Sequence, residues 1–168
     1  LGYSFIHISP YAPYSNPIPK NEHNIWEQVI LKNDIGKVHF LHRFRQENRW
    51  VNNIISENGE YRKSGNNYAN RFRYRVAVTF DLTKFKNPDK AIFFSGFNEI
   101  WLTQNAKLIP TDFARNWLFL GFGYRFNKST NVQLGYFHQY DKVGVNKYIS
   151  TPIMQLVFVK NFDFSKKE

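Results

Sequence analysis

The stretch RFRYRVAVTFDL, residues 71–82, alternates basic and apolar side chains with a period of two. One parity carries Arg71, Arg73 and Arg75, and the other carries Phe72, Tyr74, Val76, Val78, Phe80 and Leu82. Successive side chains of a β-strand point to opposite faces of its sheet. The stretch therefore predicts a strand with guanidinium groups on one face and bare hydrocarbon on the other.

Composition favours an all-β protein. The chain has 168 residues, with 17 Phe, 10 Tyr, 4 Trp and no Cys. This length suits a single domain over residues 1–168, and aromatic residues favour strands. Without Cys there is no disulfide framework, thiol nucleophile or thiolate metal site. The formal net charge of +10 favours an anionic partner such as nucleic acid, lipopolysaccharide or an acidic solute, or else reflects lysines in loops.

Period-two alternation predicts eight strands and no helix. We expect strands at about 1–8, 22–32, 37–49, 68–82, 90–103, 114–126, 131–140 and 151–164. Short connections (33–36, 83–89, 127–130) alternate with long ones (9–21, 51–67, 104–113, 141–149). Outer-membrane barrels show this asymmetry, with both termini periplasmic. The sequence thus predicts an antiparallel up-and-down transmembrane β-barrel. Because the chain opens within an apparent strand, we expect further strands upstream.

Alternation alone also fits a soluble barrel or sandwich, whose apolar face is internal. Three arginines in one strand favour the membrane, because a small soluble barrel fills its interior with apolar side chains. An Arg facing lipid at the midplane costs about 2–4 kcal/mol, so the arginines belong in the lumen. The residues predicted to face lipid are Phe72, Tyr74, Val76, Val78, Phe80, Leu118, Leu120 and Phe122.

Charged residues of the same parity predict a cluster inside the barrel. Neighbouring strands bring like charges together, and these need counter-charges or an anion. The candidate binding residues are Arg43, Arg45, Glu47, Arg71, Arg73, Arg75, Asp81 and Glu99. We also place Glu27 inward, although neither face of EHNIWEQVIL is apolar. The cluster is either a structural ladder that fills the barrel or an anion-attracting lumen.

The final strand, PIMQLVFVKNFDF (152–164), carries Phe158, Phe162 and Phe164 on one parity. It resembles the C-terminal strand by which outer-membrane barrels are recognised by their assembly machinery. The alternative is an ordinary edge strand.

Catalytic and metal-binding patterns are weak. His138 with Asp141 and Ser95 with Glu99 are the only fragments, but His138 has lipid-facing parity and Ser95 lacks a histidine base. We therefore predict no catalytic residue, metal or cofactor, and an outer-membrane hydrolase is a lesser alternative. A soluble nucleic-acid-binding β-domain would need cations and aromatics on one face, which the 71–82 stretch separates, so nucleic acid is not an expected partner.

Several segments in order resemble one family. EHNIWEQVIL, HRFRQENRW, RFRYRVAVTF, the NE of FNEIWL, RNWLFLGFGYRFNKSTNVQLGYFHQY and the terminal aromatic strand are similar to domain-of-unknown-function 2490, over residues 22–164. LGYSF resembles the end of an upstream strand repeat. The family consists of predicted bacterial outer-membrane β-barrels, so the resemblance implies the outer membrane of a Gram-negative-type bacterium and missing N-terminal strands. It supplies no activity and no site residues.

The function predicted from these patterns is a non-enzymatic integral outer-membrane protein, structural or accessory to a larger assembly. Its expected partners are outer-membrane lipid, lipopolysaccharide, the barrel assembly machinery and other outer-membrane proteins. The alternative is a narrow anion-preferring pore or transporter.

Overall fold

The computed structural model describes residues 1–10, 17–83 and 85–162. They form one antiparallel sheet whose spatial order follows the chain. Its eight strands are β1 (Gly2–Ile8), β2 (Lys20–Ile35), β3 (Val38–Glu57), β4 (Glu60–Asp81), β5 (Ala91–Gln104), β6 (Pro110–Asn127), β7 (Thr130–Gly144) and β8 (Lys147–Lys160). The all-β, antiparallel, eight-strand prediction is confirmed.

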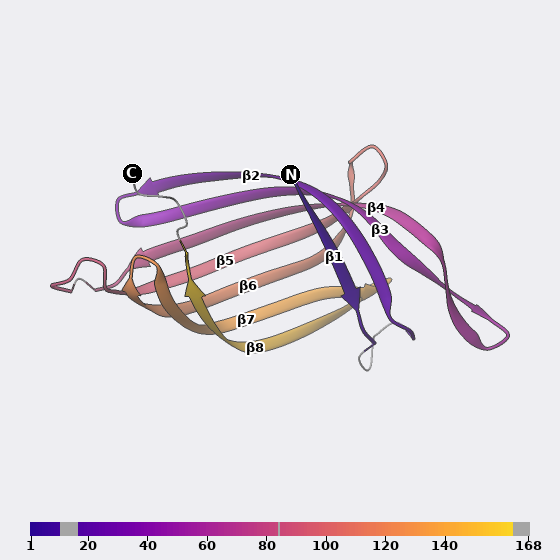
Figure 1. The fold of residues 1–168 in the computed structure, drawn as a ribbon. Coiled ribbons are helices and arrows are strands. Elements are labelled where there is room, and N and C mark those ends of the chain that lie inside the picture. The colour runs from indigo at the N-terminus through magenta and orange to yellow at the C-terminus, as the bar shows by residue number, and fades with distance from the viewer. Residues whose placement is uncertain (11–16, 84, 163–168) are drawn as a thin grey trace.

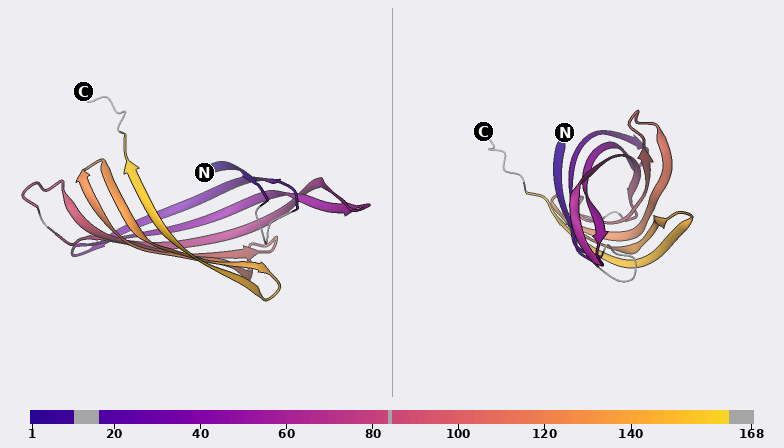
Figure 2. Two further views of the ribbon diagram at one scale, coloured as in Figure 1. Left: turned by 90° about the horizontal axis from the view of Figure 1, so that it is seen from below. Right: turned by 90° about the vertical axis from the view of Figure 1, so that its right-hand side faces the viewer.

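The sheet curls about its long axis into a half-barrel (Figure 1). Viewed from one end, the strands curve around a common axis (Figure 2). Within the described residues β1 and β8 are the two edges and do not pair with each other. Over the same residues, no helix is long and apolar enough to cross a membrane.

Two segments predicted as long loops are strands instead. β3 and β4 continue through residues 51–67 as a two-stranded arm, which projects beyond the sheet at the right of Figure 1. The arm reverses at Asn58 and Gly59, whose φ angles of 51° and 84° fit the type I′ turn favoured by Asn-Gly. β7 and β8 likewise extend into 141–149. Neither extension has a clean apolar face, so apolar alternation could not reveal it.

The convex outer face of the sheet is apolar and uncovered. Met154, Leu156 and Phe158 are each about 70% exposed, and Phe122 and Leu134 are more than half exposed. The residues predicted to face lipid have this outward parity; Leu120 and Phe122 are exposed, and the other six are partly exposed beside their neighbours. The concave face holds the buried residues. The concave face therefore holds the buried charged residues together with rings such as Trp101 and Phe119, and the convex face is mainly apolar.

Close strand packing on the concave face depends on glycine. Gly121 and Gly135 lie directly opposite each other on β6 and β7. A Cβ on Gly135 would lie 2.5 Å from the Leu120 carbonyl oxygen and 2.7 Å from the Phe119 ring. The missing side chains let the Phe119 ring lie against the backbone, where it is almost fully buried.

Candidate functional site

Glu99 of β5 is the first centre of the interior charge cluster. Its side chain is fully buried, and three arginines from β3 and β4 donate to it. Oε1 accepts from Arg43 Nη2 at 2.7 Å and from Arg73 Nε at 2.8 Å, while Oε2 accepts from Arg75 Nε at 2.8 Å. One carboxylate thus serves three guanidinium groups.

Glu47 of β3 is the second centre, and it is also fully buried. It accepts from Arg71 Nε at 2.5 Å and from Arg73 Nη1 at 2.8 Å. Arg73 therefore bridges Glu47 and Glu99. Arg45 lies directly opposite Arg73, but its Nη1 is 4.0 Å from Glu47 and its firm hydrogen bond, 2.8 Å from Nη2, goes to Gln28.

A third carboxylate, Glu22 of β2, escaped the sequence prediction. It is buried and accepts two hydrogen bonds from Arg49, of 2.7 and 2.6 Å. The placement of Glu27 inside was wrong, because Glu27 is exposed on the opposite parity and Gln28 faces Arg45 instead. The sequence does contain a signal for Glu22. It shares one parity with Asn24, Trp26 and Gln28, and the inward-facing Arg49 needs an acceptor on that face.

Aromatic rings support the guanidinium groups. Trp101 is buried on β5, with the Arg73 guanidinium 3.7 Å and the Arg71 guanidinium 4.4 Å from its ring centre. Arg75 lies 4.1 Å over Phe97, and Arg45 lies 4.1 Å over Trp26. These cation–π distances lie within the attractive range of about 6 Å. The rings replace part of the hydration that the arginines lose.

The cluster carries excess positive charge. Six guanidinium groups face three carboxylates, which leaves three positive charges over; the set is Arg43, Arg45, Arg49, Arg71, Arg73, Arg75, Glu22, Glu47 and Glu99. The carboxylate side chains are at most 3% exposed, whereas those of the arginines are 9–24% exposed. The carboxylates therefore lie beneath the guanidinium groups, and the concave surface presents cations.

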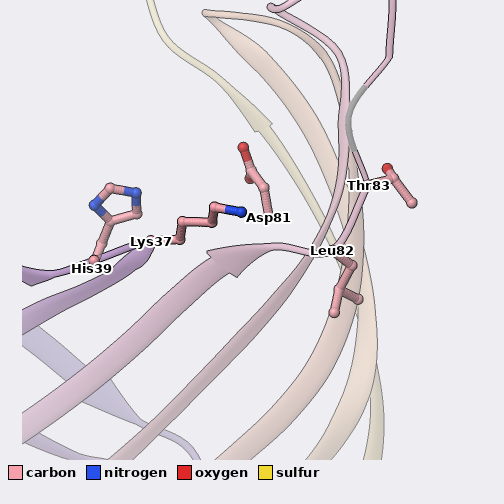
Figure 3. Close-up of a pocket in the computed structure, with 6 residues that line it drawn as sticks. Lys37, His39, Asp81, Leu82 and Thr83 are labelled. Atoms are coloured by element: carbon pink, nitrogen blue, oxygen red, sulfur yellow. The ribbon is translucent and has the colours of Figure 1, made fainter.

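Asp81 stands apart from the cluster. It pairs with Arg125 of β6 at 2.7 Å, at the short-turn end of the sheet. There it lines a wide cavity of about 620 Å³ with Lys37 and His39 (Figure 3). The parity of Asp81 was right, but six residues of strand separate it from Arg75, roughly 20 Å. Strand parity predicts the face on which a residue lies, but not how close it lies along the strand to other residues of that face.

A second cleft, of about 380 Å³, lies on the concave side of β4–β8. Its floor is aromatic and its other lining residues include one arginine and three glutamines. The lining residues are Arg75, Ser95, Phe97, Trp117, Phe119, Gln133, Phe137, Gln139, Gln155 and Val157.

The two residue pairs considered as catalytic candidates, His138 with Asp141 and Ser95 with Glu99, do not form catalytic pairs in the structure. His138 is on the outer face, where its Nε2 lies 2.6 Å from Ser150 Oγ. Asp141 is on the inner face and accepts from Trp117 Nε1 at 3.3 Å. Both oxygens of Glu99 are taken by arginines, so it cannot serve Ser95 as a base.

The histidines near the short-turn end also lie apart. His39 contacts Asp34, and His42 contacts Tyr74 on the other face. In the part of the chain that the structure describes, no three His, Asp or Glu side chains are grouped to hold a metal.

Fold and site together define a half-barrel protein with an ionic interior and an apolar exterior. The family model "Protein of unknown function (DUF2490)" matches residues 1–149, so the chain belongs to this family. The match includes LGYSF and ends before most of β8. No curated protein and no solved structure matches the chain.

Proposed function

We propose that the chain forms part of a transmembrane β-barrel in the outer membrane of a Gram-negative-type bacterium. The observation that carries this proposal is the inverted amphipathicity of the sheet. Buried Glu47 and Glu99 lie on the concave side, whereas Leu156 and Phe158 are about 70% exposed on the convex side. If the protein were soluble, this large apolar face would be exposed to water, which soluble proteins avoid. Lipid covers it at no cost.

The length of the apolar band agrees with a membrane span. On β4 it runs from Phe72 to Phe80, roughly 26 Å along the strand. Barrel strands tilt by about 35–45°, so this run covers most of an apolar band about 25 Å tall. On β6 and β7 the corresponding runs are Leu118–Phe126 and Val132–Tyr140.

Polar side chains on the outer face are largely paired with one another. Asn98 and Asn116 exchange two hydrogen bonds, of 3.0 and 3.1 Å, between β5 and β6. His42 contacts the Tyr74 hydroxyl at 2.9 Å. Polar groups at a lipid-facing surface need such partners because lipid tails offer none. For the same reason, the edges β1 and β8 must be paired in the membrane, with each other or with further strands.

We place the short-turn end in the periplasm and the extended arms outside, where lipopolysaccharide lies. β8 ends at Lys160, opposite Thr130 and beside the short turn at 128–129. Phe158 and Phe162 are about 70% exposed near this end and suit recognition by the barrel assembly machinery; Phe164 lies outside the described residues.

The proposed role is structural and non-enzymatic: the chain is an accessory wall of a larger outer-membrane assembly. The ionic ladder supports it, because each carboxylate is engaged by arginines and fills interior space. The excess of three positive charges favours the second candidate, a narrow anion-preferring pore, since excess positive charge attracts anions. Conductance of the full-length protein in a planar bilayer distinguishes the two roles. Absence of current supports the structural role, and an anion-selective current supports the pore.

Membrane placement is tested by arginine substitutions on neighbouring positions of β4. Val78→Arg should lower the free energy of unfolding from lipid vesicles by about 2–4 kcal/mol, because the charge enters hydrocarbon. Ala77→Arg is the matched control, since its side chain enters the concave interior, and it should cost less. Equal and mild losses would contradict the membrane proposal.

The His138–Ser150 contact makes a hydrolase the remaining enzymatic alternative. In the described residues no hydrogen bond orients the other ring nitrogen of His138, so the pair lacks the third group that such nucleophiles use. Full-length protein in detergent should therefore show no Ser150-dependent labelling by a fluorophosphonate probe. Labelling that disappears in Ser150→Ala would establish a reactive serine and refute the non-enzymatic role.

A further inference from the structure

The cleft over β4–β8 owes its flat floor to two glycines at the centre of one row of residues across the sheet. Ser95, Gly121, Gly135 and Gln155 lie opposite one another across β5, β6, β7 and β8. The two glycines at the centre let the Phe119 ring lie against the strands. The result is an apolar floor with about 380 Å³ above it, within the usual size of small-molecule sites.

One end of the cleft is cationic. Arg75 is the most exposed guanidinium of the charge cluster, with 24% of its side chain accessible, and Glu99 beneath it is fully covered. Arg75 donates to Glu99 through Nε and Nη2, and its Nη1 has no acceptor among the described residues. Arg43 lies directly opposite Arg75 and carries a buried Nε without a partner there. The cluster as a whole has three positive charges in excess.

Three other polar side chains of the cleft have no hydrogen-bond partner among the described residues. Ser95, Gln139 and Gln155 make no side-chain hydrogen bond to any residue that the structure describes, whereas Gln133 is held by Asn131. Amide and hydroxyl groups both donate and accept, so they can bind either neutral or anionic oxygens. No carboxylate lines the cleft, so nothing at its surface repels an anion.

We propose that this cleft binds a small organic acid. Its carboxylate is held at the Arg75 end, its flat apolar body lies over the floor formed by Phe97, Phe119 and Phe137, and Gln139 and Gln155 hydrogen-bond its edge. Guanidinium groups are suited to planar carboxylates because they offer paired donors. The inference rests on the proposed function, because the concave face is then the interior through which small solutes reach the cleft.

A matched pair of probes tests the charge. Benzoate and benzamide have the same shape and differ in charge. Each is titrated into full-length protein in detergent, and saturation-transfer NMR measures its binding. Benzoate should bind at least about tenfold more tightly than benzamide, since only benzoate forms charge-assisted hydrogen bonds. Equal binding, or no binding of benzoate, would overturn the proposal.

Variants test the position. Arg75→Gln should reduce benzoate binding to the level of benzamide, while retained benzamide binding shows that the cleft persists. Gln155→Trp should fill the cleft and exclude both probes without touching the charge cluster. Arg62→Gln, on the projecting arm where Arg62 pairs with exposed Glu57, is the control and should change nothing. Benzoate binding that survives in both Arg75→Gln and Gln155→Trp would place the site elsewhere.

Failure of this inference is distinguishable from failure of the membrane proposal. Protein that inserts into vesicles and is sensitive to Val78→Arg, yet does not bind benzoate, refutes the cleft alone. Protein that binds benzoate and tolerates Val78→Arg refutes the membrane proposal alone.

Discussion

The two halves of the concave face solve the same packing problem differently. Over β2–β5 the interior is filled by ion pairs, with Glu47 and Glu99 fully buried beneath arginines. Over β5–β8 it is filled by rings, with Phe119 and Phe137 buried and glycines beneath Phe119. Trp101 joins the halves, because Arg73 from one side and Arg115 from the other lie within 4.5 Å of its ring centre.

This difference predicts which kind of substitution destabilises each half. A buried ion network depends on charge balance, so losing one partner strands the others in a low-dielectric interior. A ring-and-glycine packing depends on volume, so one added methyl group forces strands or rings apart. The first half should therefore respond to changes of charge at constant size, and the second to changes of size at constant polarity.

The largest effect is expected from Glu99→Gln in the ionic half. The change preserves shape but removes the counter-charge of Arg43, Arg73 and Arg75. Breaking buried ion pairs in this way costs about 3–5 kcal/mol, which urea unfolding of the full-length protein in vesicles would measure.

Glu57→Gln is the matched control. Glu57 pairs with Arg62 on the exposed arm, and its loss should cost no more than about 1 kcal/mol. If Glu99→Gln were equally mild, the ionic half would be hydrated rather than sealed, and the ladder would not be structural.

A smaller effect is expected from Gly135→Ala in the aromatic half. The new Cβ would lie 2.5 Å from the Leu120 carbonyl oxygen and 2.7 Å from Gly121 Cα, so β6 and β7 must separate locally. Such overpacking costs about 1–3 kcal/mol. Gly144→Ala is the control, because its Cβ would be 3.7 Å from the nearest atoms, those of Lys147. Similar unfolding midpoints for the two variants would refute the close packing.

The ionic half was largely predictable from sequence, because its charges share one strand parity. Arg71, Arg73 and Arg75 alternate with apolar residues, so the sequence predicts that they share one face of the strand. The connection to the preceding strand places Arg43 and Arg45 beside them. Burial of Glu22 was not predictable in the same way. In EHNIWEQVIL carboxylates occur on both parities, and only the contact with Arg49 determines which one faces inward.

The aromatic half was harder to predict, because aromatic residues occupy both faces of its strands. On β6, Phe119 and Trp117 point inward while Leu118 and Phe122 point outward, so hydrophobicity does not distinguish the sides. The strand arms were missed for a related reason. Backbone hydrogen bonds and the Asn58–Gly59 turn define the arm at residues 51–67, and apolar alternation carries no information about either.

The smallest effect concerns Asp112 of β6 and Lys142 of β7, which lie beyond the apolar band and outside both halves. The hydrogen bond from Lys142 lowers the pKa of the Asp112 carboxyl below its ordinary value, and the same bond raises the pKa of Lys142. A lowered pKa in the folded state stabilises the fold above the ordinary carboxyl pKa, and this contribution is lost as the pH falls through the folded value. Because Asp112 is exposed and Lys142 is partly exposed, we expect Lys142→Gln to leave the unfolding midpoint unchanged between neutral and mildly acidic pH. The same variant should raise the pKa of Asp112 toward its ordinary value, measured by carboxyl-carbon NMR titration. A fall in the neutral-pH midpoint as large as that of Gly135→Ala would mean that the rim pair helps to hold β6 against β7, and that stability is not confined to the two interior halves.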